Sequence, residues 1–249
     1  MMKNYELIAD LFCQQKINTC FALLGDANMH WAGAMHERGV EFVYARHEHV
    51  AVAAATAYAR SSGKIGCASV TCGPGLTQIM TILPIAVRAN IPLIIFAGEA
   101  PISNSWYNQM IDQPPFVKAC GAKYFSLHTQ DLIMEQIDAA FKCARDNKTP
   151  VVIGAPFDLQ KSPCGDLPDS VPSGTVMSSP VKPQLDPRNI KHAASLIDAS
   201  KHPIIIAGLG VVAAGAKNAC VELAKKSGAL LATTLPAKGL FYDQPYSIG

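Results

Sequence analysis

Charged residues are scarce in this chain. Lysine, arginine, aspartate and glutamate make up 16% of the 249 residues, against about 25% in an average soluble domain. The formal net charge is only +2, and no basic cluster stands out. These features argue against a nucleic-acid partner, which requires a basic patch or stripe. A surface so poor in charge also suggests that something else covers part of it.

Long apolar runs and paired cysteines are lacking too. No apolar run is long enough to cross a bilayer, and residues 1–10 contain acids instead of the apolar core of a signal peptide. The eight cysteines are scattered without CxxC spacing, which argues against a zinc site or a disulfide framework. Reduced thiols are typical of the cytosol. We therefore expect a cytoplasmic protein that does not enter the membrane.

Strand-like and helix-like segments alternate along residues 1–160. Short apolar runs, such as the continuous run from Ile91 to Ala97, are separated by stretches with helical spacing. This alternation predicts an α/β fold, with a doubly wound, mostly parallel sheet flanked by helices. Residues 161–187 are rich in proline and serine and have no period, which predicts an interdomain linker. Residues 188–249 offer only two further strands, so we expect an incomplete Rossmann-like second domain.

Two helices and one irregular connection are predicted in more detail. The helical pattern from Thr77 to Ala89 contains Pro84, at which we expect a kink. Residues 98–113 have no pattern and are expected to form an irregular connection. In the second domain, a helix is expected over residues 213–226.

The chain is organised around residues 44–78. The polar cluster Arg46-His47-Glu48-His49 precedes an alanine-rich helical pattern that ends near Gly63. A helix with small apolar residues on every side is buried on every side, so polar groups at its start require an explanation. Taken alone, Glu48 is explained by the helix dipole and the unpaired N–H groups of the first turn. The two histidines are two residues apart and face different sides of a helix, so no metal site is predicted in this chain.

Two glycine-containing turns follow predicted strands. Gly73-Pro74-Gly75 is either a simple tight turn or a place where backbone lies against a ligand, and it lacks the Walker lysine of a P-loop. Residues 208–213 (GLGVVA) match the dinucleotide fingerprint G-x-G-x-x-G/A. However, residues 230–234, where an acid should hold the ribose, contain none. We read these later glycines as room for a tight turn, with a Rossmann-type oxidoreductase as the alternative.

Taken together, the motifs resemble those of the thiamine-diphosphate-dependent enzymes of the acetolactate synthase and benzoylformate decarboxylase type. Residues 46–48 (RHE) are similar to the RHE motif of that family, and residues 71–75 (TCGPG) to its TSGPG. Residues 108–113 (NQMIDQ) resemble its FQExDQ segment. Residues 202–214 and 233–249 resemble the opening half of its central domain. The resemblance covers nearly the whole chain, and the spacing of the first two motifs is specific.

The resemblance implies a cofactor, thiamine diphosphate, and residues that bind it. In the family, the RHE glutamate hydrogen-bonds a ring nitrogen of the aminopyrimidine and so promotes loss of the thiazolium C2 proton. Glu48 stands at that position and is the implied catalytic residue. The implied cofactor-binding residues are Gly25, Glu48, Gly73, Pro74 and Gly75, and Gln109 is implied on the substrate side. The implied reaction is decarboxylation or carboligation of a 2-oxo acid, in a homodimer or homotetramer with the site at the subunit interface.

Some family features are absent or altered. Gly25 lacks the preceding proline of the family's first glycine turn, Gln78 replaces the asparagine of the acetolactate synthases, and Met110 replaces a glutamate. These departures leave the substrate open. The Gly-Asp-Gly and distant asparagine that hold magnesium and the diphosphate in the family have no counterpart, because Gly25-Asp26-Ala27 lies in the wrong domain.

These absences lead to expectations about the rest of the enzyme. Magnesium is expected to be held by a domain absent from this chain. The chain alone, as a truncation or a separate subunit, is expected to be inactive. Binding of FAD in the central domain stays open. A non-catalytic interaction module of the same fold is a further alternative.

Overall fold

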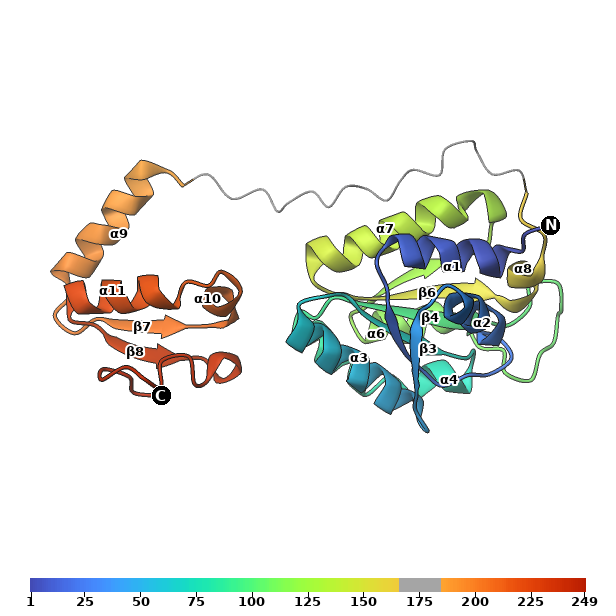
Figure 1. The fold of residues 1–249 in the computed structure, drawn as a ribbon, viewed down its shortest axis with the longest axis horizontal. Coiled ribbons are helices and arrows are strands. Elements are labelled where there is room, and N and C mark those ends of the chain that lie inside the picture. The colour runs from blue at the N-terminus through green and yellow to red at the C-terminus, as the bar shows by residue number, and fades with distance from the viewer. Residues whose placement is uncertain (166–184) are drawn as a thin grey trace. The chain divides into compact units, whose positions relative to one another are not determined.

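The computed structural model of the chain describes residues 1–165 and 185–249. The chain divides into two compact units, Met1–Ser178 and Ser179–Gly249, which are described separately (Figure 1). Most of the predicted linker lies outside the described residues. Its first residues lie against the first unit, since Pro163 forms a β-bridge with Lys3. None of the described helices is both long and apolar enough to span a bilayer.

A six-stranded parallel sheet forms the centre of the first unit. Its order is β2-β1-β3-β4-β6-β5, and all five neighbouring pairs are parallel. The strands are β1 (Thr19–Ala22), β2 (Glu41–Tyr44), β3 (Gly66–Val70), β4 (Leu93–Glu99), β5 (Lys123–Ser126) and β6 (Pro150–Pro156). Every residue of β3, β4 and β6 is buried, as expected for strands covered on both faces. The predicted α/β fold is thus confirmed.

Helices cover both faces of this sheet (Figure 1). They are α1 (Asn4–Gln14), α2 (Met29–Glu37), α3 (Glu48–Ser62), α4 (Pro74–Thr77), α5 (Ile82–Arg88), α6 (Gln113–Ala119), α7 (Ile133–Asn147, preceded by the 3₁₀ turn η1, Gln130–Leu132) and α8 (Phe157–Lys161). One buried cluster joins α1, α2 and α7 to the sheet, and a second joins α3, α5 and α6 to the opposite face. The sheet is therefore packed on both sides.

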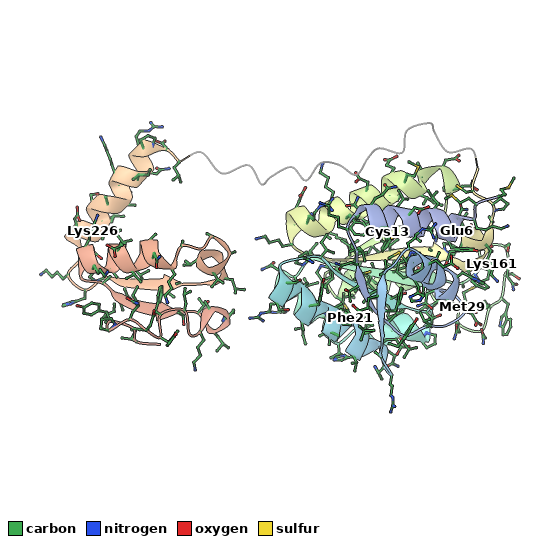
Figure 2. All side chains as sticks on the ribbon, viewed as in Figure 1. Glu6, Cys13, Phe21, Met29, Lys161 and Lys226 are labelled. Atoms are coloured by element: carbon green, nitrogen blue, oxygen red, sulfur yellow. The ribbon has the colours of Figure 1, made fainter. Side chains whose placement is uncertain are left out.

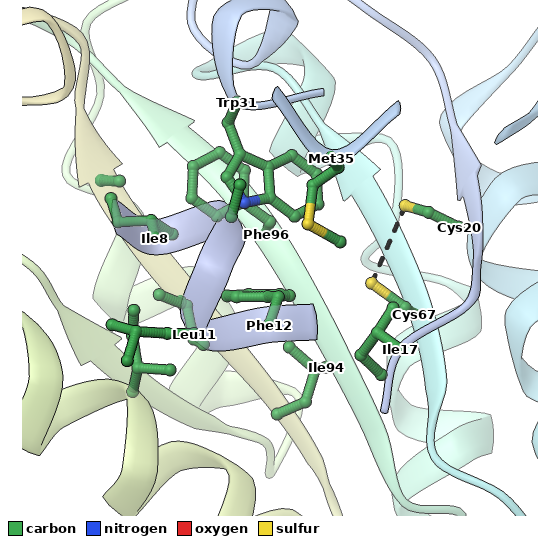
Figure 3. Close-up of a cluster of buried hydrophobic side chains, with 14 of the residues drawn as sticks. Ile8, Leu11, Phe12, Ile17, Cys20, Trp31, Met35, Cys67, Ile94 and Phe96 are labelled. Carbon is green, nitrogen blue, oxygen red and sulfur yellow. Dashed lines mark hydrogen bonds between the residues drawn. The ribbon is translucent and has the colours of Figure 1, made fainter. Parts of the chain in front are cut away.

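Aromatic rings fill the first cluster (Figure 3). The ring of Trp31 stacks on Phe96 with centroids 4.2 Å apart, and Phe12 meets Trp31 edge-on at 5.1 Å. Beside them, the Sγ atoms of Cys20 and Cys67 lie 3.7 Å apart on neighbouring strands. All eight cysteines lie within the described residues, and all are free thiols.

The prediction of one continuous, kinked helix over residues 77–89 is wrong. The structure has two short helices there, α4 and α5, separated by turns over residues 78–81. Pro84 does not kink a continuous helix but lies in the first turn of α5, where a missing N–H costs nothing. For the same reason Pro114 and Pro115 fit the first turn of α6, a helix for which the sequence pattern gave no indication.

The second unit contains a two-stranded parallel sheet, β7 (Ile204–Ala207) and β8 (Leu230–Thr233). Its helices are α9 (Pro187–Ala199), α10 (Leu209–Ala213) and α11 (Lys217–Ser227), with a 3₁₀ turn η2 (Leu235–Ala237). The predicted helix over residues 213–226 is thus split at residues 214–216. A small core around Val221, Leu231 and Phe241 holds this unit together, and many side chains extend outward from its ribbon (Figure 2).

Candidate cofactor site

The topology of the first unit creates a crevice beside β1. From β1 the chain moves to β2 on one side, and then crosses to β3 on the other. The loops that follow β1 and β3 therefore diverge at the carboxyl edge, which is where open parallel sheets bind ligands. A pocket of about 490 Å³ opens there, within the size range of small-molecule sites. It is lined by Leu23, Leu24, Gly25, His47, Glu48, Thr71, Pro74, Gly75, Gln78 and Gln109.

Glu48 reaches this pocket from the first position of α3. The preceding His47 is the helix N-cap, and its Nδ1 accepts a hydrogen bond from the His49 N–H at 3.1 Å. The Glu48 carboxylate is half-buried and forms no hydrogen bond or ion pair with any residue that the structure describes. An acidic side chain also interacts favourably with the partial positive charge of a helix start. The carboxylate is therefore available to a ligand.

The turn that follows β3 supplies backbone to the same pocket. Gly73 has φ 60° and ψ −112°, a conformation that only glycine adopts readily, and a Cβ there would overlap the carbonyl oxygen of Gln109. Pro74 begins α4. A Cβ on Gly75 would lie 2.7 Å from Cγ2 of Thr71 and 3.5 Å from Oε1 of Glu48. Bare backbone at position 75 thus faces the carboxylate.

Gly25 and Thr71 close the crevice between β1 and β3. A Cβ on Gly25 would lie 2.7 Å from Oγ1 of Thr71, so the two loops can approach only because residue 25 is glycine. The Thr71 hydroxyl is buried and has no hydrogen-bond partner within residues 1–165 and 185–249. An unpaired buried hydroxyl is costly.

Gln109 comes from the loop between β4 and α6. The Cys72 thiol donates a hydrogen bond to Gln109 Oε1 at 3.4 Å, and burial raises the pKa of Cys72, which keeps the thiol protonated as a donor. The start of the same loop is held by Asp158 on α8, whose carboxylate accepts the N–H groups of Ile102 at 3.0 Å and Ser103 at 2.8 Å. The loop that carries Gln109 is thus anchored at both ends.

The structure brings most of the predicted residues together. Five of them, from four separate segments, line one pocket: Gly25, Glu48, Pro74, Gly75 and Gln109. Gly73 does not line it but lies buried behind it, with its N–H bonded to the side chain of Gln113 at 3.0 Å. Sequence reasoning missed Cys72, Gln113 and Asp158. The first two lie inside quoted motifs, whereas nothing in the sequence connects Asp158 to this loop. The roles of all these residues stay predictions.

Two models of one protein family match this chain. The model described as "Thiamine pyrophosphate enzyme, N-terminal TPP binding domain" matches residues 2–116. The model of the central domain of the same enzymes matches residues 190–249. Together they account for more than half of the chain, and the first includes every residue that lines the pocket.

The relatives point to the same family. The chain is 31% identical over 255 residues to the "Probable acetolactate synthase large subunit" of Methanocaldococcus jannaschii, covering 100% of this chain and 43% of the relative. It is also 31% identical over 258 residues to "Acetolactate synthase isozyme 2 large subunit" of Escherichia coli K12, covering 100% and 45%. The chain thus spans less than half the length of these relatives.

A solved structure shows the same fold. A protein of Mycobacterium smegmatis, assigned as a thiamin diphosphate-dependent enzyme, matches with a TM-score of 0.80 at 24% identity, over 94% of this chain and 45% of the other. The family models, the relatives and the fold agree with one another. The chain belongs to the thiamine pyrophosphate enzyme family.

Proposed function

We propose that this chain supplies the pyrimidine-binding half of a thiamine diphosphate site in an acetolactate synthase-like enzyme that acts on 2-oxo acids. The reaction would be decarboxylation or carboligation. One observation carries the proposal. Glu48 from α3, Gly75 from the turn after β3 and Gln109 from the loop after β4 meet in a single pocket.

The residues present suit an aminopyrimidine ring. Leu23, Leu24 and Pro74 give the pocket apolar surface against which a flat ring can lie. The Glu48 carboxylate and the Thr71 hydroxyl, which have no hydrogen-bond partner among the residues that the structure describes, are polar groups that a heteroaromatic ring with an amino group could satisfy. The absent side chain of Gly75 leaves room for such a ring beside Glu48.

The chain's own residues would orient the cofactor and handle a proton. When bound, thiamine diphosphate supplies a thiazolium ring that stabilises carbanion character beside a substrate carbonyl. Glu48 would hold a proton at a ring nitrogen of the aminopyrimidine, a task suited to a carboxylate positioned within hydrogen-bond reach of the ring. The Gly75 backbone would lie against the ring, and the Gln109 amide would face the substrate.

The diphosphate would be held elsewhere. No lysine or arginine is among the described residues that line the pocket, although charge-assisted contacts are the strong ones for phosphate. We therefore propose that Mg²⁺ and the diphosphate bind to residues outside this chain, and that any FAD would bind in the central domain. A homodimer or homotetramer with the site at the interface is supported by two exposed apolar side chains, Tyr44 at the end of β2 (63% exposed) and Val50 in the first turn of α3 (54% exposed). The free thiols fit a cytoplasmic enzyme.

Calorimetric titration of the 249-residue chain tests this division of the site. Thiamine and thiamine diphosphate, the latter with Mg²⁺, should both bind more weakly than micromolar. Thiamine diphosphate should bind less than about tenfold more tightly than thiamine, because its diphosphate gains no charge-assisted hydrogen bond from this pocket. Micromolar binding of thiamine diphosphate by this chain alone would contradict the proposal.

A further inference from the structure

A chain of buried polar side chains lies behind the pocket. Glu99, the last residue of β4, is only 8% exposed. One of its carboxylate oxygens accepts a hydrogen bond from the Tyr124 hydroxyl on β5, and the other contacts Nε2 of His128. The His128 side chain is 52% exposed. Glu99 thus links a half-exposed histidine to a buried tyrosine.

The chain continues to the turn that lines the pocket. Gln113, the first residue of α6, donates its side-chain N–H to the Tyr124 hydroxyl at 2.9 Å. The other end of the same amide, Oε1, accepts the backbone N–H of Gly73 at 3.0 Å. The sequence of contacts is therefore His128, Glu99, Tyr124, Gln113 and Gly73. It connects β4, β5 and α6 with the loop after β5 and the turn after β3.

The direction of each hydrogen bond follows from Glu99. The Tyr124 hydroxyl has a single proton and donates it to Oε1 of Glu99. Burial and the neighbouring Glu99 charge raise the pKa of Tyr124, so the hydroxyl keeps that proton. The Tyr124 oxygen can then only accept from Gln113, which points Gln113 Oε1 toward Gly73. Without an acceptor at Glu99, Tyr124 could donate to Gln113 Oε1 instead, and the amide would turn its NH₂ group toward the Gly73 N–H.

Strand β6 has a glycine where Glu99 and Tyr124 meet. A Cβ on Gly154, in β6, would overlap both Oε1 of Glu99 and the hydroxyl of Tyr124. Glycine at this position leaves space for a carboxylate and a phenol between two sheet strands. Because a buried charge is costly unless it is paired and hydrogen-bonded, Glu99 requires both of its partners.

We propose that Glu99 is a positioning residue for the Gly73-Pro74-Gly75 turn. It acts through Tyr124 and Gln113, which hold the Gly73 N–H and so fix the backbone that faces Glu48. Its importance for cofactor binding rests on the proposed function. The hydrogen-bond relay itself is a property of the chain without cofactor.

Amide hydrogen exchange in the ¹⁵N-labelled 249-residue chain tests the relay. The exchange rate of the Gly73 amide, relative to that of Ile95 in β4, is measured in Glu99→Met, Tyr124→Phe and Glu99→Gln. The first two variants should raise the relative rate about fivefold or more, since a hydrogen bond contributes about 1 kcal/mol. Glu99→Gln keeps an acceptor oxygen for Tyr124 and should leave the rate unchanged. Tyr58→Phe is the matched control, because among the described residues its hydroxyl bonds to exposed Asn18 alone.

Three results of the exchange experiment would contradict the proposed relay from Glu99 to Gly73. If Glu99→Met does not fold, Tyr124→Phe gives the answer. An unchanged relative rate in folded Tyr124→Phe, or equal acceleration of Gly73 and Ile95, would overturn the relay. Loss of protection in Glu99→Gln equal to that in Tyr124→Phe would overturn the argument from hydrogen-bond direction. These rates are measured without cofactor, so a failure of thiamine to bind would count against the proposed function and not against the relay.

Discussion

Glu48, the first residue of α3, both begins a helix and lines the candidate cofactor pocket. As a helix-start acid it interacts favourably with unpaired N–H groups, which is why its position alone could not identify a site. What distinguishes it is its surroundings, the Gly75 backbone and the Thr71 hydroxyl that has no partner among the described residues. The family resemblance implied that Glu48 and the glycine turn belong to one site, and Glu48, Pro74 and Gly75 line one pocket.

Replacing Glu48 with glutamine tests its proposed role. In a longer protein that contains this segment and binds the cofactor, Glu48→Gln should slow hydrogen–deuterium exchange at the cofactor's C2 by about 10²–10⁴-fold, the usual contribution of a proton-handling group. The amide keeps the volume but cannot stabilise a proton on the aminopyrimidine.

Circular dichroism and cofactor content serve as controls for this variant. Glu37→Gln, which changes an acid near the end of α2, is the matched substitution. Unchanged C2 exchange in folded, cofactor-loaded Glu48→Gln would mean that Glu48 is only a helix-start residue.

At the scale of elements, the strands were easier to predict than the helices and loops. Strands covered on both faces require unbroken apolar runs, so β4 and β6 are visible in the sequence. Prolines misled the prediction of α5 and α6, because proline is acceptable in a first helical turn and is otherwise a breaker. The contacts of Glu99 with Tyr124 depend on β6 lying between β4 and β5. Such long-range pairing is not encoded in any local pattern.

The loop after β4 provides a prediction about pH. Burial raises the pKa of Asp158, but hydrogen bonds from Ser103 and Ile102 outweigh it and lower the pKa overall. A carboxylate with a lowered folded pKa stabilises the fold above its ordinary value of 3.8, and this stability is lost as pH falls through the lowered pKa. Asp158→Asn should therefore cost about 1 kcal/mol at pH 7, and less as pH falls below 4.

Urea unfolding of wild type and variant across this pH range is the measurement. Asp131→Asn, a change at an exposed acid in η1, controls for general loss of negative charge. A destabilisation by Asp158→Asn that stays constant from pH 7 to pH 3 would show that the carboxylate's charge does not anchor the loop.

At the scale of the whole molecule, the two units differ in how much they bury. The first unit encloses two buried clusters around six strands, whereas α9 in the second has no buried residue. The family models match both units, and the chain covers 43% of the M. jannaschii relative. Composition and alternation could predict the α/β class. They could not predict which strands are neighbours, and hence which loops share a pocket.

The central claim is that the pocket between β1 and β3 binds the aminopyrimidine end of the cofactor. Titrating thiamine into the ¹⁵N-labelled 249-residue chain tests it most directly, because NMR detects millimolar binding. The amides of Gly25, Glu48 and Gly75 should shift with saturable behaviour, those of α11 should not, and Glu48→Gln should weaken the effect. Saturable shifts confined to other surfaces, or none around Glu48 and Gly75, would contradict the account.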